Sequence, residues 1–275
     1  MNTPPPPASK KRFPASLPGW SAAPSATRVS RPPAVARPVV SGARAALNAG
    51  AVRQPAASGL GLDSQAVREA MVQRLRQQPE MNAQVLAALA QVPRHRFLET
   101  ALVNQAYADT SLPIGWGQTI SKPSVVARML SLLVQGRSVP LGRVLEIGSG
   151  CGYQAAVLAQ LARHVVSVER VHGLYAMSKR HLDELGVRNV NAVYGDGMRG
   201  YGPSAPYDAI IAAAGGEAIP EAWLAQLAVG GRLVAPCRDA RGVQSLVLIE
   251  HSITGFVRHG LEAVQFVPLK SGVVN

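Results

Sequence analysis

The chain has 275 residues, of which 47% are hydrophobic, so it can bury one full-sized core and is not a peptide-sized scaffold. Its two cysteines, Cys151 and Cys237, exclude a disulfide framework and a four-cysteine zinc site, and are typical of a reducing compartment. No window approaches the ~18 consecutive apolar residues of a membrane-spanning helix, and residues 4–7 are prolines where a signal peptide would need an apolar run. We therefore expect a cytoplasmic protein without a membrane partner.

The formal net charge is +12, but it is distributed unevenly along the chain. Residues 1–62 hold eight of the 28 Lys and Arg residues and no acidic residue, whereas the rest of the chain has 20 basic and 16 acidic residues. A globular part so close to neutral gives little electrostatic reason for a nucleic-acid groove. The sequence therefore predicts that no nucleic acid is required.

Residues 1–62 also differ from the rest in composition. They are rich in Pro, Ala, Ser and Arg, with Phe13 and Trp20 as the only aromatic residues. Such a segment cannot bury enough apolar surface to offset the loss of chain entropy. We predict a disordered basic extension over residues 1–62 and one folded domain over residues 63–275. A transit peptide or a tether to an anionic surface stays open as the alternative for the extension.

Helical periodicity begins near Asp63, which can cap a helix whose apolar residues recur one turn apart over residues 67–75. A second helix is predicted over residues 85–90 and ends before Pro93. Within the folded domain, residues 63–122 should therefore hold N-terminal helices and a polar loop, and residues 123–275 should hold the sheet.

From residue 143 onward, short apolar runs alternate with amphipathic stretches, which is typical of βαβ units. Helices are predicted to begin near residues 154, 173 and 219. The pattern predicts an α/β fold with a mostly parallel sheet of about seven strands. The predicted strands are residues 143–147, 165–168, 190–194, 207–213, 231–235, 245–250 and 264–267.

A glycine-rich turn follows the first predicted strand. Gly148, Gly150 and Gly152 can adopt a positive φ or leave out a β-carbon where a ligand lies against the backbone. The dinucleotide fingerprint would need its third glycine at position 153, which is Tyr153. The spacing therefore favours a nucleoside joined to methionine over a dinucleotide. A purely structural tight turn is the alternative.

Two acidic residues follow the next two strands. Glu169 lies 21 residues beyond Gly148 and can accept hydrogen bonds from both ribose hydroxyls of a nucleoside. Asp196, between two glycines, can accept from an adenine amine. Taken alone, Glu169 could be a solvated strand end and Asp196 a plain turn. Because the carboxyl ends of parallel strands share one crevice, we predict S-adenosyl-L-methionine as cofactor and S-adenosyl-L-homocysteine as product.

Residues 107–123 precede the sheet and form a loop by their Pro and Gly content, yet they are dense in hydroxyl, amide and aromatic groups. Ser121 and Pro123 lead into a helix that is predicted over residues 125–132. Ser121 is therefore either a functional hydroxyl or a simple helix cap.

The loop sequence LPIGWGQTISKP (residues 112–123) resembles the hallmark loop of the protein-L-isoaspartate (D-aspartate) O-methyltransferase family. The resemblance covers about residues 63–272, and residues 1–62 lie outside it. It continues through VPRHRF (92–97), VLEIGSGCGYQ (144–154), SVER (167–170), GDG (195–197), PYDAII (206–211), LAVGGRLVAP (227–236) and VQFVPL (264–269).

The resemblance implies a Rossmann-like class I methyltransferase that uses S-adenosylmethionine to methylate the α-carboxylate of L-isoaspartyl residues in damaged proteins. The ester then cyclises to a succinimide, which hydrolyses partly to normal aspartyl; D-aspartyl residues are a further possible acceptor. The resemblance makes Ser121 the catalytic residue. The predicted cofactor-binding residues, from motifs and resemblance together, are Gln118, Thr119, Ile120, Glu146, Gly148, Ser149, Gly150, Gly152, Glu169, Arg170, Asp196 and Gly197.

The chemistry agrees with the absence of a catalytic dyad. A carboxylate with an ordinary pKa of about 4 is ionised at neutral pH, so the nucleophile needs no general base. Catalysis then depends on alignment and exclusion of water, with Ser121 as a hydrogen-bonding positioner. The spacing of the histidines matches no metal motif, so no metal is expected. We also expect a monomer.

The sequence departs from the family pattern at Cys151, at residues 214–217 and at Lys270, to which no role is carried over. Two other functions stay open. One is a methyltransferase of the same fold that acts on RNA or a small carboxylic acid, which only the basic extension supports. The other is an inactive protein that binds the cofactor or isoaspartyl chains.

Overall fold

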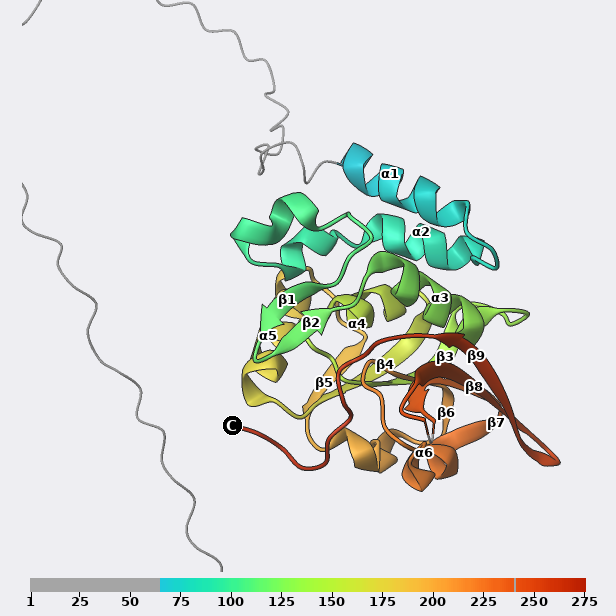
Figure 1. Ribbon diagram of the computed structural model, residues 1–275. Coiled ribbons are helices and arrows are strands. Elements are labelled where there is room, and N and C mark those ends of the chain that lie inside the picture. Colours follow the sequence, from blue (N-terminus) through green and yellow to red (C-terminus); the bar gives the residue numbers. More distant parts are fainter. Residues whose placement is uncertain (1–64, 240) are drawn as a thin grey trace, which may run out of the picture. The chain divides into compact units, whose positions relative to one another are not determined.

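The computed structural model describes residues 65–239 and 241–275, so Asp63 and the extension predicted for residues 1–62 lie outside the described residues. Seven of the described strands form one central sheet (Figure 1). They are β3 (Leu141–Ile147), β4 (Ala162–Glu169), β5 (Val190–Tyr194), β6 (Tyr207–Ala212), β7 (Leu227–Arg238), β8 (Gln244–Ser252) and β9 (Gly255–Ala263).

The strand order is β5-β4-β3-β6-β7-β8-β9, and the first five strands in this order are parallel. β8 is antiparallel to both β7 and β9. Ile147 at the end of β3 lies opposite Val168 of β4 and Ala212 of β6. These three strands thus end side by side, and the loops that follow them open at one edge of the sheet. The prediction of a mostly parallel α/β sheet of about seven strands is confirmed.

The last predicted strand is wrong. Residues 264–267 lie outside the strands, and the seventh strand is β9. β9 is at the edge of the sheet and mostly exposed, so its sequence lacks the apolar run by which a buried strand is recognised. Val264 and Phe266 are apolar for another reason, because their side chains pack against the larger core cluster.

The helices agree with the predicted ones to within a few residues. Asn82 caps the second helix, since its side chain accepts hydrogen bonds from the amides of Gln84 and Val85. The α-helices are α1 (Gln65–Arg76), α2 (Ala83–Gln91), α3 (Pro123–Val134), α4 (Tyr153–Leu158), α5 (His172–Glu184) and α6 (Glu221–Gln226). The 3-10 helices are η1 (Arg94–Phe97), η2 (Thr100–Gln105), η3 (Gly197–Arg199) and η4 (Gly202–Ser204).

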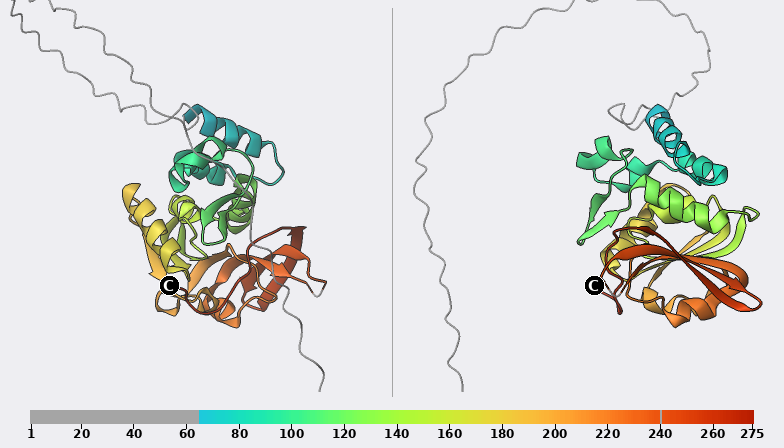
Figure 2. Two further views of the ribbon diagram at one scale, coloured as in Figure 1. Left: turned by 60° about the vertical axis from the view of Figure 1, so that its left-hand side comes forward. Right: turned by 45° about the vertical axis from the view of Figure 1, so that its right-hand side comes forward.

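Both faces of the sheet are buried, because successive side chains of a strand point to opposite faces. On one face, Val144 and Val165 join a core with residues of α1, α2, α3, α4 and α5. On the other face, Leu145 and Val166 join a core with Trp223 of α6. Figure 2 shows α1, α2 and α3 on one side of the sheet and α6 on the other. Coverage of both faces explains why the central strands are continuous apolar runs in the sequence.

A buried arginine joins the N-terminal helices to the rest of the fold. Arg94 is fully buried, and its Nε donates to the carbonyl oxygen of Ala106 at 2.8 Å. Its guanidinium carbon lies 4.8 Å from the centre of the Tyr153 ring in α4. Burial lowers the pKa of Arg94 below its ordinary value. Arg94 thus holds the segment that leads to the polar loop against the helix that follows the glycine turn.

The segment predicted as a loop contains a β-hairpin, which corrects the prediction. β1 (Leu112–Gly115) pairs antiparallel with β2 (Gln118–Ile120). Trp116 and Gly117 form the turn between them, with φ of +50° and +67°. The hairpin forms because Leu112 and Ile114 alternate inward with outward residues. It places the segment before Ser121 against the carboxyl edge of the central sheet.

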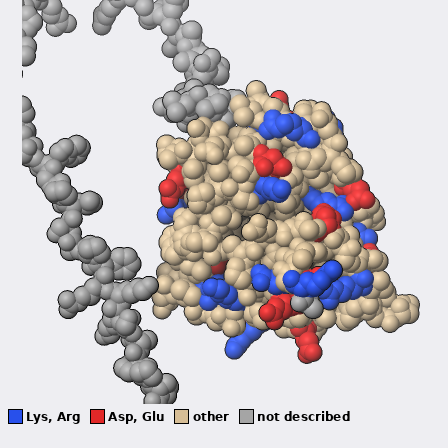
Figure 3. All heavy atoms as spheres, viewed as in Figure 1, with Lys and Arg blue, Asp and Glu red and all other residues tan. Residues whose placement is uncertain are grey.

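Basic and acidic side chains are interspersed over the face of the molecule in Figure 3, so this face carries no broad area of one charge. In the part of the chain that the structure describes, no helix is both long and apolar enough to cross a membrane.

Candidate active site

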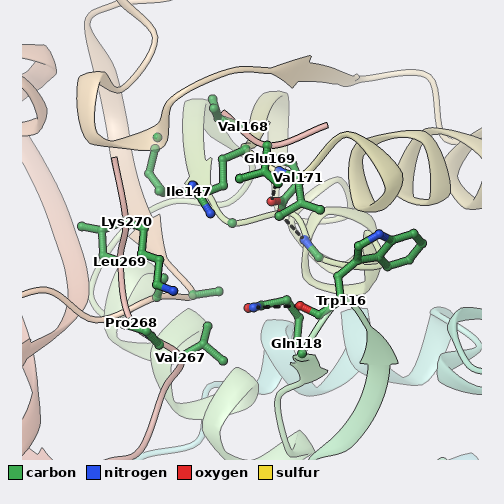
Figure 4. A pocket seen from close by; sticks show the side chains of 18 of the residues that line it. Trp116, Gln118, Ile147, Val168, Glu169, Val171, Val267, Pro268, Leu269 and Lys270 are labelled. Carbon is green, nitrogen blue, oxygen red and sulfur yellow. Dashed lines mark hydrogen bonds between the residues drawn. The ribbon is translucent and has the colours of Figure 1, made fainter. Parts of the chain in front are cut away.

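A cavity of about 460 Å³ lies at the carboxyl ends of β3, β4 and β6. Its walls are the glycine turn after β3, the β1–β2 hairpin and the chain that follows β9. We call residues 267–275 the C-terminal strap. In Figure 4, Lys270 of the strap points into the cavity toward Gln118 of the hairpin. The volume is within the range of small-molecule pockets, about 300–1,000 Å³.

The glycine turn brings bare backbone to this cavity. Gly148 and Gly150 line it with φ of +87° and +53°, a region that favours glycine. A Cβ at position 150 would lie only 3.2 Å from Cδ1 of Ile114 in the hairpin. The turn therefore needs glycine both for its backbone shape and for the closeness of the hairpin.

Glu169 ends β4 and lines the same cavity (Figure 4). The side chain is 4% exposed, and two backbone amides hold its carboxylate: Gly150 N donates to Oε2 at 3.0 Å, and Val171 N donates to Oε1 at 2.9 Å. Each carboxylate oxygen can accept a second hydrogen bond. The carboxylate is thus held in place with acceptor capacity left on both oxygens, and its contact with a ribose stays a prediction.

Glu146 lies beneath the glycine turn and outside the cavity lining. It is fully buried, and its Oε2 accepts a hydrogen bond from the hydroxyl of Ser167, which is also bonded to the hydroxyl of Ser149. Burial raises the pKa of Glu146 to about 8, although the hydrogen bond from Ser167 opposes the shift. At neutral pH the side chain is therefore mostly a neutral acid within a polar network that supports the turn.

A second cavity, of about 760 Å³, adjoins the first. Ser121, Lys122 and residues 263–267 line it. Thr119 and Ala213 line both cavities. The two cavities therefore meet beside Thr119, with the glycine turn and Glu169 on one side and Ser121 on the other.

The hydroxyl of Ser121 is not used as a helix cap. The N-cap of α3 is Lys122, whose own side chain makes no capping hydrogen bond. The amide of Ser124 in the first turn donates instead to Oδ1 of Asp109 at 2.8 Å. The interpretation of Ser121 as a simple cap is therefore wrong. Its half-buried side chain lines the second cavity instead.

The remaining predicted residues lie at different depths. Ile120 and Ser149 line a small cavity of about 30 Å³ that Ser121 also reaches. Gly152 is the N-cap of α4 with φ of +90°, and a Cβ there would lie 3.2 Å from the backbone of Ser178 in α5. Gly152 thus permits close packing of two helices. The predicted residues that line the first cavity are Gln118, Thr119, Gly148, Gly150, Glu169, Arg170 and Gly197.

Asp196 lies one residue from the cavity lining. Its Oδ1 accepts from the amide of Met198 at 2.9 Å, and its Oδ2 accepts from the amide of Gly272 in the C-terminal strap at 2.8 Å. Its neighbour Gly197 lines the cavity. These contacts do not test whether Asp196 also accepts from an adenine amine, which stays a prediction.

Sequence reasoning missed several residues that line the first cavity, among them Trp116 and Gly117 of the hairpin turn. Val171 and Ala213 lie within two residues of the ends of β4 and β6, so the rule that ligands bind at the carboxyl ends of parallel strands could have found them. Residues 267–270 and Val274 of the C-terminal strap had no such signal. Their place depends on where the chain returns after β9, which no local pattern encodes.

Among residues 65–239 and 241–275, no group of three or more His, Cys, Asp and Glu side chains could hold a metal ion. Cys151 is buried in the glycine turn, and burial raises the pKa of its thiol to about 11. The thiol is therefore protonated at neutral pH and acts as a small side chain that fills space.

The sheet, the glycine turn after its central strand and the carboxylate at the end of the neighbouring strand define a Rossmann-like methyltransferase of class I. The lining fits the cofactor of this class, because it offers bare backbone at Gly148 and Gly150, two carboxylate acceptors on Glu169, and apolar walls. The chain belongs to the protein-L-isoaspartate(D-aspartate) O-methyltransferase family, whose model matches residues 66–274.

Similar proteins agree with this assignment. The protein-L-isoaspartate O-methyltransferase of Methylibium petroleiphilum is 61% identical over 220 residues, which are 78% of this chain and 81% of that protein. The one of Bordetella petrii is 50% identical over 258 residues, which are 93% of this chain and 90% of that protein.

Solved structures share the fold. A protein-L-isoaspartate O-methyltransferase matches with a TM-score of 0.68 and 29% identity, over 75% of this chain and 67% of that chain. A structure from Plasmodium falciparum, in complex with S-adenosyl-L-homocysteine, matches with a TM-score of 0.64 and 24% identity, over 74% of this chain and 98% of that chain.

Proposed function

We propose that this protein transfers the methyl group of S-adenosylmethionine to the α-carboxylate of L-isoaspartyl residues in damaged proteins and peptides. The ester cyclises to a succinimide, and its hydrolysis restores part of the normal aspartyl linkage. The observation that carries the proposal is the meeting of two cavities beside Thr119, one with Glu169 and the glycine turn and the other with Ser121. D-aspartyl residues are a second acceptor to be tested.

The first cavity is the proposed cofactor site. S-adenosylmethionine supplies, when bound, an electrophilic methyl group on a positively charged sulfur. Glu169 would accept from the ribose hydroxyls, and the backbone of Gly148 and Gly150 would lie against the nucleoside, since these residues line the cavity. Gln118 and Thr119 would contact the cofactor at the end of the first cavity where the second cavity begins.

The other predicted cofactor-binding residues are proposed to act at the edge of this site or from behind it. Arg170 and Gly197 line the cavity, and Asp196 lies beside Gly197. The remaining residues support the turn or the junction without lining the cofactor cavity; they are Ile120, Glu146, Ser149 and Gly152.

The second cavity is the proposed acceptor site. The acceptor carboxylate is ionised at neutral pH, so no side chain has to remove a proton. Ser121 would donate a hydrogen bond to one carboxylate oxygen and so turn the other toward the junction at Thr119. The exposed Lys122 beside it adds positive charge at the mouth of the cavity. Such positioning of reactants can supply roughly 7–11 kcal/mol of the barrier reduction.

We also propose that residues 63–275 are the whole catalytic unit and act as a monomer. In support, the family model matches residues 66–274, and residues of one chain line both cavities. Within this unit, residues 63–122 contribute the N-terminal helices and the hairpin, and residues 123–275 contribute the core with the cofactor cavity.

The test uses two synthetic peptides that differ only in one residue, L-isoaspartyl in one and L-aspartyl in the other. The purified protein is incubated with each peptide and labelled S-adenosylmethionine, and base-labile methyl ester is counted. We expect ester on the isoaspartyl peptide alone. Ester on neither peptide, with S-adenosyl-L-homocysteine still bound, would contradict the acceptor and redirect the search to RNA or small carboxylic acids. A matching D-aspartyl peptide measures the second acceptor.

A further inference from the structure

The C-terminal strap, residues 267–275, crosses the carboxyl edge of the sheet after β9 (Figure 1). Its first attachment is at the loop after β6. There, Gly215 N donates to the carbonyl oxygen of Val267 at 2.9 Å, and Leu269 N donates to the carbonyl oxygen of Gly215 at 2.8 Å. Leu269 also packs against the core on the α6 face of the sheet. The beginning of the strap is therefore firmly fixed.

The second attachment uses two side chains at the ends of β4 and β5. Arg170 donates from Nε to the carbonyl oxygen of Gly272 at 2.9 Å and from Nη2 to that of Ser271 at 3.2 Å. Asp196 accepts from the amide of Gly272 at 2.8 Å. Arg170 thus holds the carbonyl oxygen of Gly272, and Asp196 holds the amide of the same residue.

Main-chain pairing completes the second attachment. Val274 forms a parallel bridge with Val171, and the hydroxyl of Tyr194 donates to Oδ1 of Asn275 at 3.0 Å. In the sheet, β4 and β6 are the two neighbours of β3. A strap that is fixed beyond β6 and again at β4 must cross the end of β3, where the glycine turn and the cavity lie.

The strap is the wall of the cavity that can open at the lowest cost. Local opening needs less free energy where fewer apolar groups are buried. Val273 and Val274 of the strap are 51% and 42% exposed. The hairpin has an exposed turn residue, Trp116 at 55%, but it is anchored to the core by Ile114 and Ile120, each 4% exposed. Hydrogen bonds to the exposed backbone of Ser271 and Gly272 hold this part of the strap, and water can replace these bonds.

We propose that Arg170 and Asp196 are positioning residues that latch the C-terminal strap over the cofactor cavity, and that release of residues 270–275 admits S-adenosylmethionine and lets S-adenosyl-L-homocysteine leave. The fixed point of this motion is Leu269. The inference rests on the proposed function, because it takes the first cavity as the cofactor site. In this role Arg170 and Asp196 act through the strap and do not have to contact the cofactor themselves.

The first test locks the strap with a disulfide. The variant V171C/V274C joins the paired positions, and the native cysteines Cys151 and Cys237 are buried. Association and dissociation of S-adenosyl-L-homocysteine are followed by stopped-flow tryptophan fluorescence, because Trp116 lines the cavity. We expect both rate constants to fall at least tenfold in the oxidised protein and to recover on reduction, so the reduced form is the matched control. Equal rates in a protein shown by mass spectrometry to be cross-linked would overturn the proposal.

The second test releases the strap and does not depend on cross-linking. Asp196→Ala and a chain ending at Lys270 should each raise the dissociation rate constant of S-adenosyl-L-homocysteine about tenfold. The combination should add little, because the shorter chain lacks Gly272, the strap partner of Asp196. Full additivity would show instead that Asp196 acts without the strap.

Arg188→Ala is the control, since this arginine side chain is 79% exposed and forms an ion pair with Asp183, away from the strap. It should leave both rate constants unchanged. If the natural protein does not bind S-adenosyl-L-homocysteine at all, the proposed function fails. If the natural protein binds it and all strap variants keep its rates, only the strap proposal fails.

Discussion

Glu169 and Asp196 lie at similar places, at or just after the carboxyl ends of the neighbouring parallel strands β4 and β5, but their hydrogen bonds differ. The amides that hold Glu169 belong to Gly150 and Val171, which line the first cavity. One amide that holds Asp196 belongs to Gly272, close to the C-terminal end of the described residues. Strand order predicts that both carboxylates reach the same edge of the sheet. It cannot predict a partner that is 76 residues away and has no pattern of its own.

Ser121→Ala tests the proposed positioning hydroxyl. The hydroxyl is not used as a cap and lines the second cavity, the proposed acceptor site, so its removal should take one hydrogen bond from the charged acceptor carboxylate. Such a bond contributes about 1.5–3 kcal/mol, which corresponds to a fall in kcat of roughly 10- to 100-fold. Steady-state kinetics with an isoaspartyl peptide measure kcat, and calorimetry should show unchanged affinity for S-adenosyl-L-homocysteine. Ser124→Ala is the control on the neighbouring helix; unchanged turnover in Ser121→Ala would contradict the role.

Glu146→Gln tests the buried acid beneath the glycine turn. Burial raises the pKa of Glu146 to about 8 in the folded protein, whereas the unfolded chain ionises near 4.5. Between these values the folded state holds a proton that the unfolded state releases, so wild-type stability falls as pH rises, by up to about 1.4 kcal/mol per pH unit. The neutral glutamine lacks this loss. Thermal unfolding should therefore show the Tm of Glu146→Gln rising relative to wild type from pH 5 to pH 8. A constant difference would argue against the raised pKa.

At the scale of elements, the hairpin and α3 form one unit that presents Ser121. The carboxylate of Asp109, which precedes β1, accepts a hydrogen bond from the amide of Ser124 in the first turn of α3. Arg74 of α1 donates to the carbonyl oxygen of Tyr107 at 2.8 Å. The chain on both sides of Ser121 is thus fixed by side chains from other elements. This is why a segment with the composition of a loop can hold a hydroxyl in one place.

Asp109→Ala should loosen this unit. The loss of a side-chain cap costs about 1 kcal/mol, and for a domain of this size it lowers the Tm by roughly 2–4 °C. Because the first turn of α3 directly follows Ser121, kcat should fall more than the affinity for S-adenosyl-L-homocysteine. Calorimetric unfolding and peptide kinetics measure the two effects. Asp109→Asn keeps an acceptor oxygen and should restore most of both; if it behaves like alanine, the hydrogen bond to Ser124 is not the cause.

The elements that the sequence predicted well are those that the core determines. Continuous apolar runs located β3, β4 and β6 because helices cover both faces of these strands. Prediction from apolar runs failed where burial and secondary structure do not coincide. β9 is a strand whose residues are mostly exposed, and residues 264–267 are mostly apolar without forming a strand. The β1–β2 hairpin was missed for a similar reason, because its strands are four and three residues long and too short to show a period.

At the scale of the whole molecule, the charge of the chain and the two cavities belong to different parts. The residues that line the two cavities lie between Ser111 and Val274. Eight of the 28 basic residues lie in residues 1–62, outside the described residues and outside the family match. The high net charge is therefore no argument about the acceptor that the active site selects.

Removal of residues 1–62 should leave the reaction intact. We expect kcat and KM for a neutral isoaspartyl peptide to stay within about twofold of the full chain at physiological salt, because the residues that form both cavities remain. Kinetics of the two proteins side by side provide the measurement. A large fall in kcat would show that the extension takes part in catalysis and would contradict the proposed catalytic unit.

If the full chain binds RNA in a salt-sensitive manner and the shortened chain does not, the extension acts by charge alone, since each phosphate contact releases counterions and weakens with added salt. Equal methyl transfer by both proteins would then separate that binding from the chemistry.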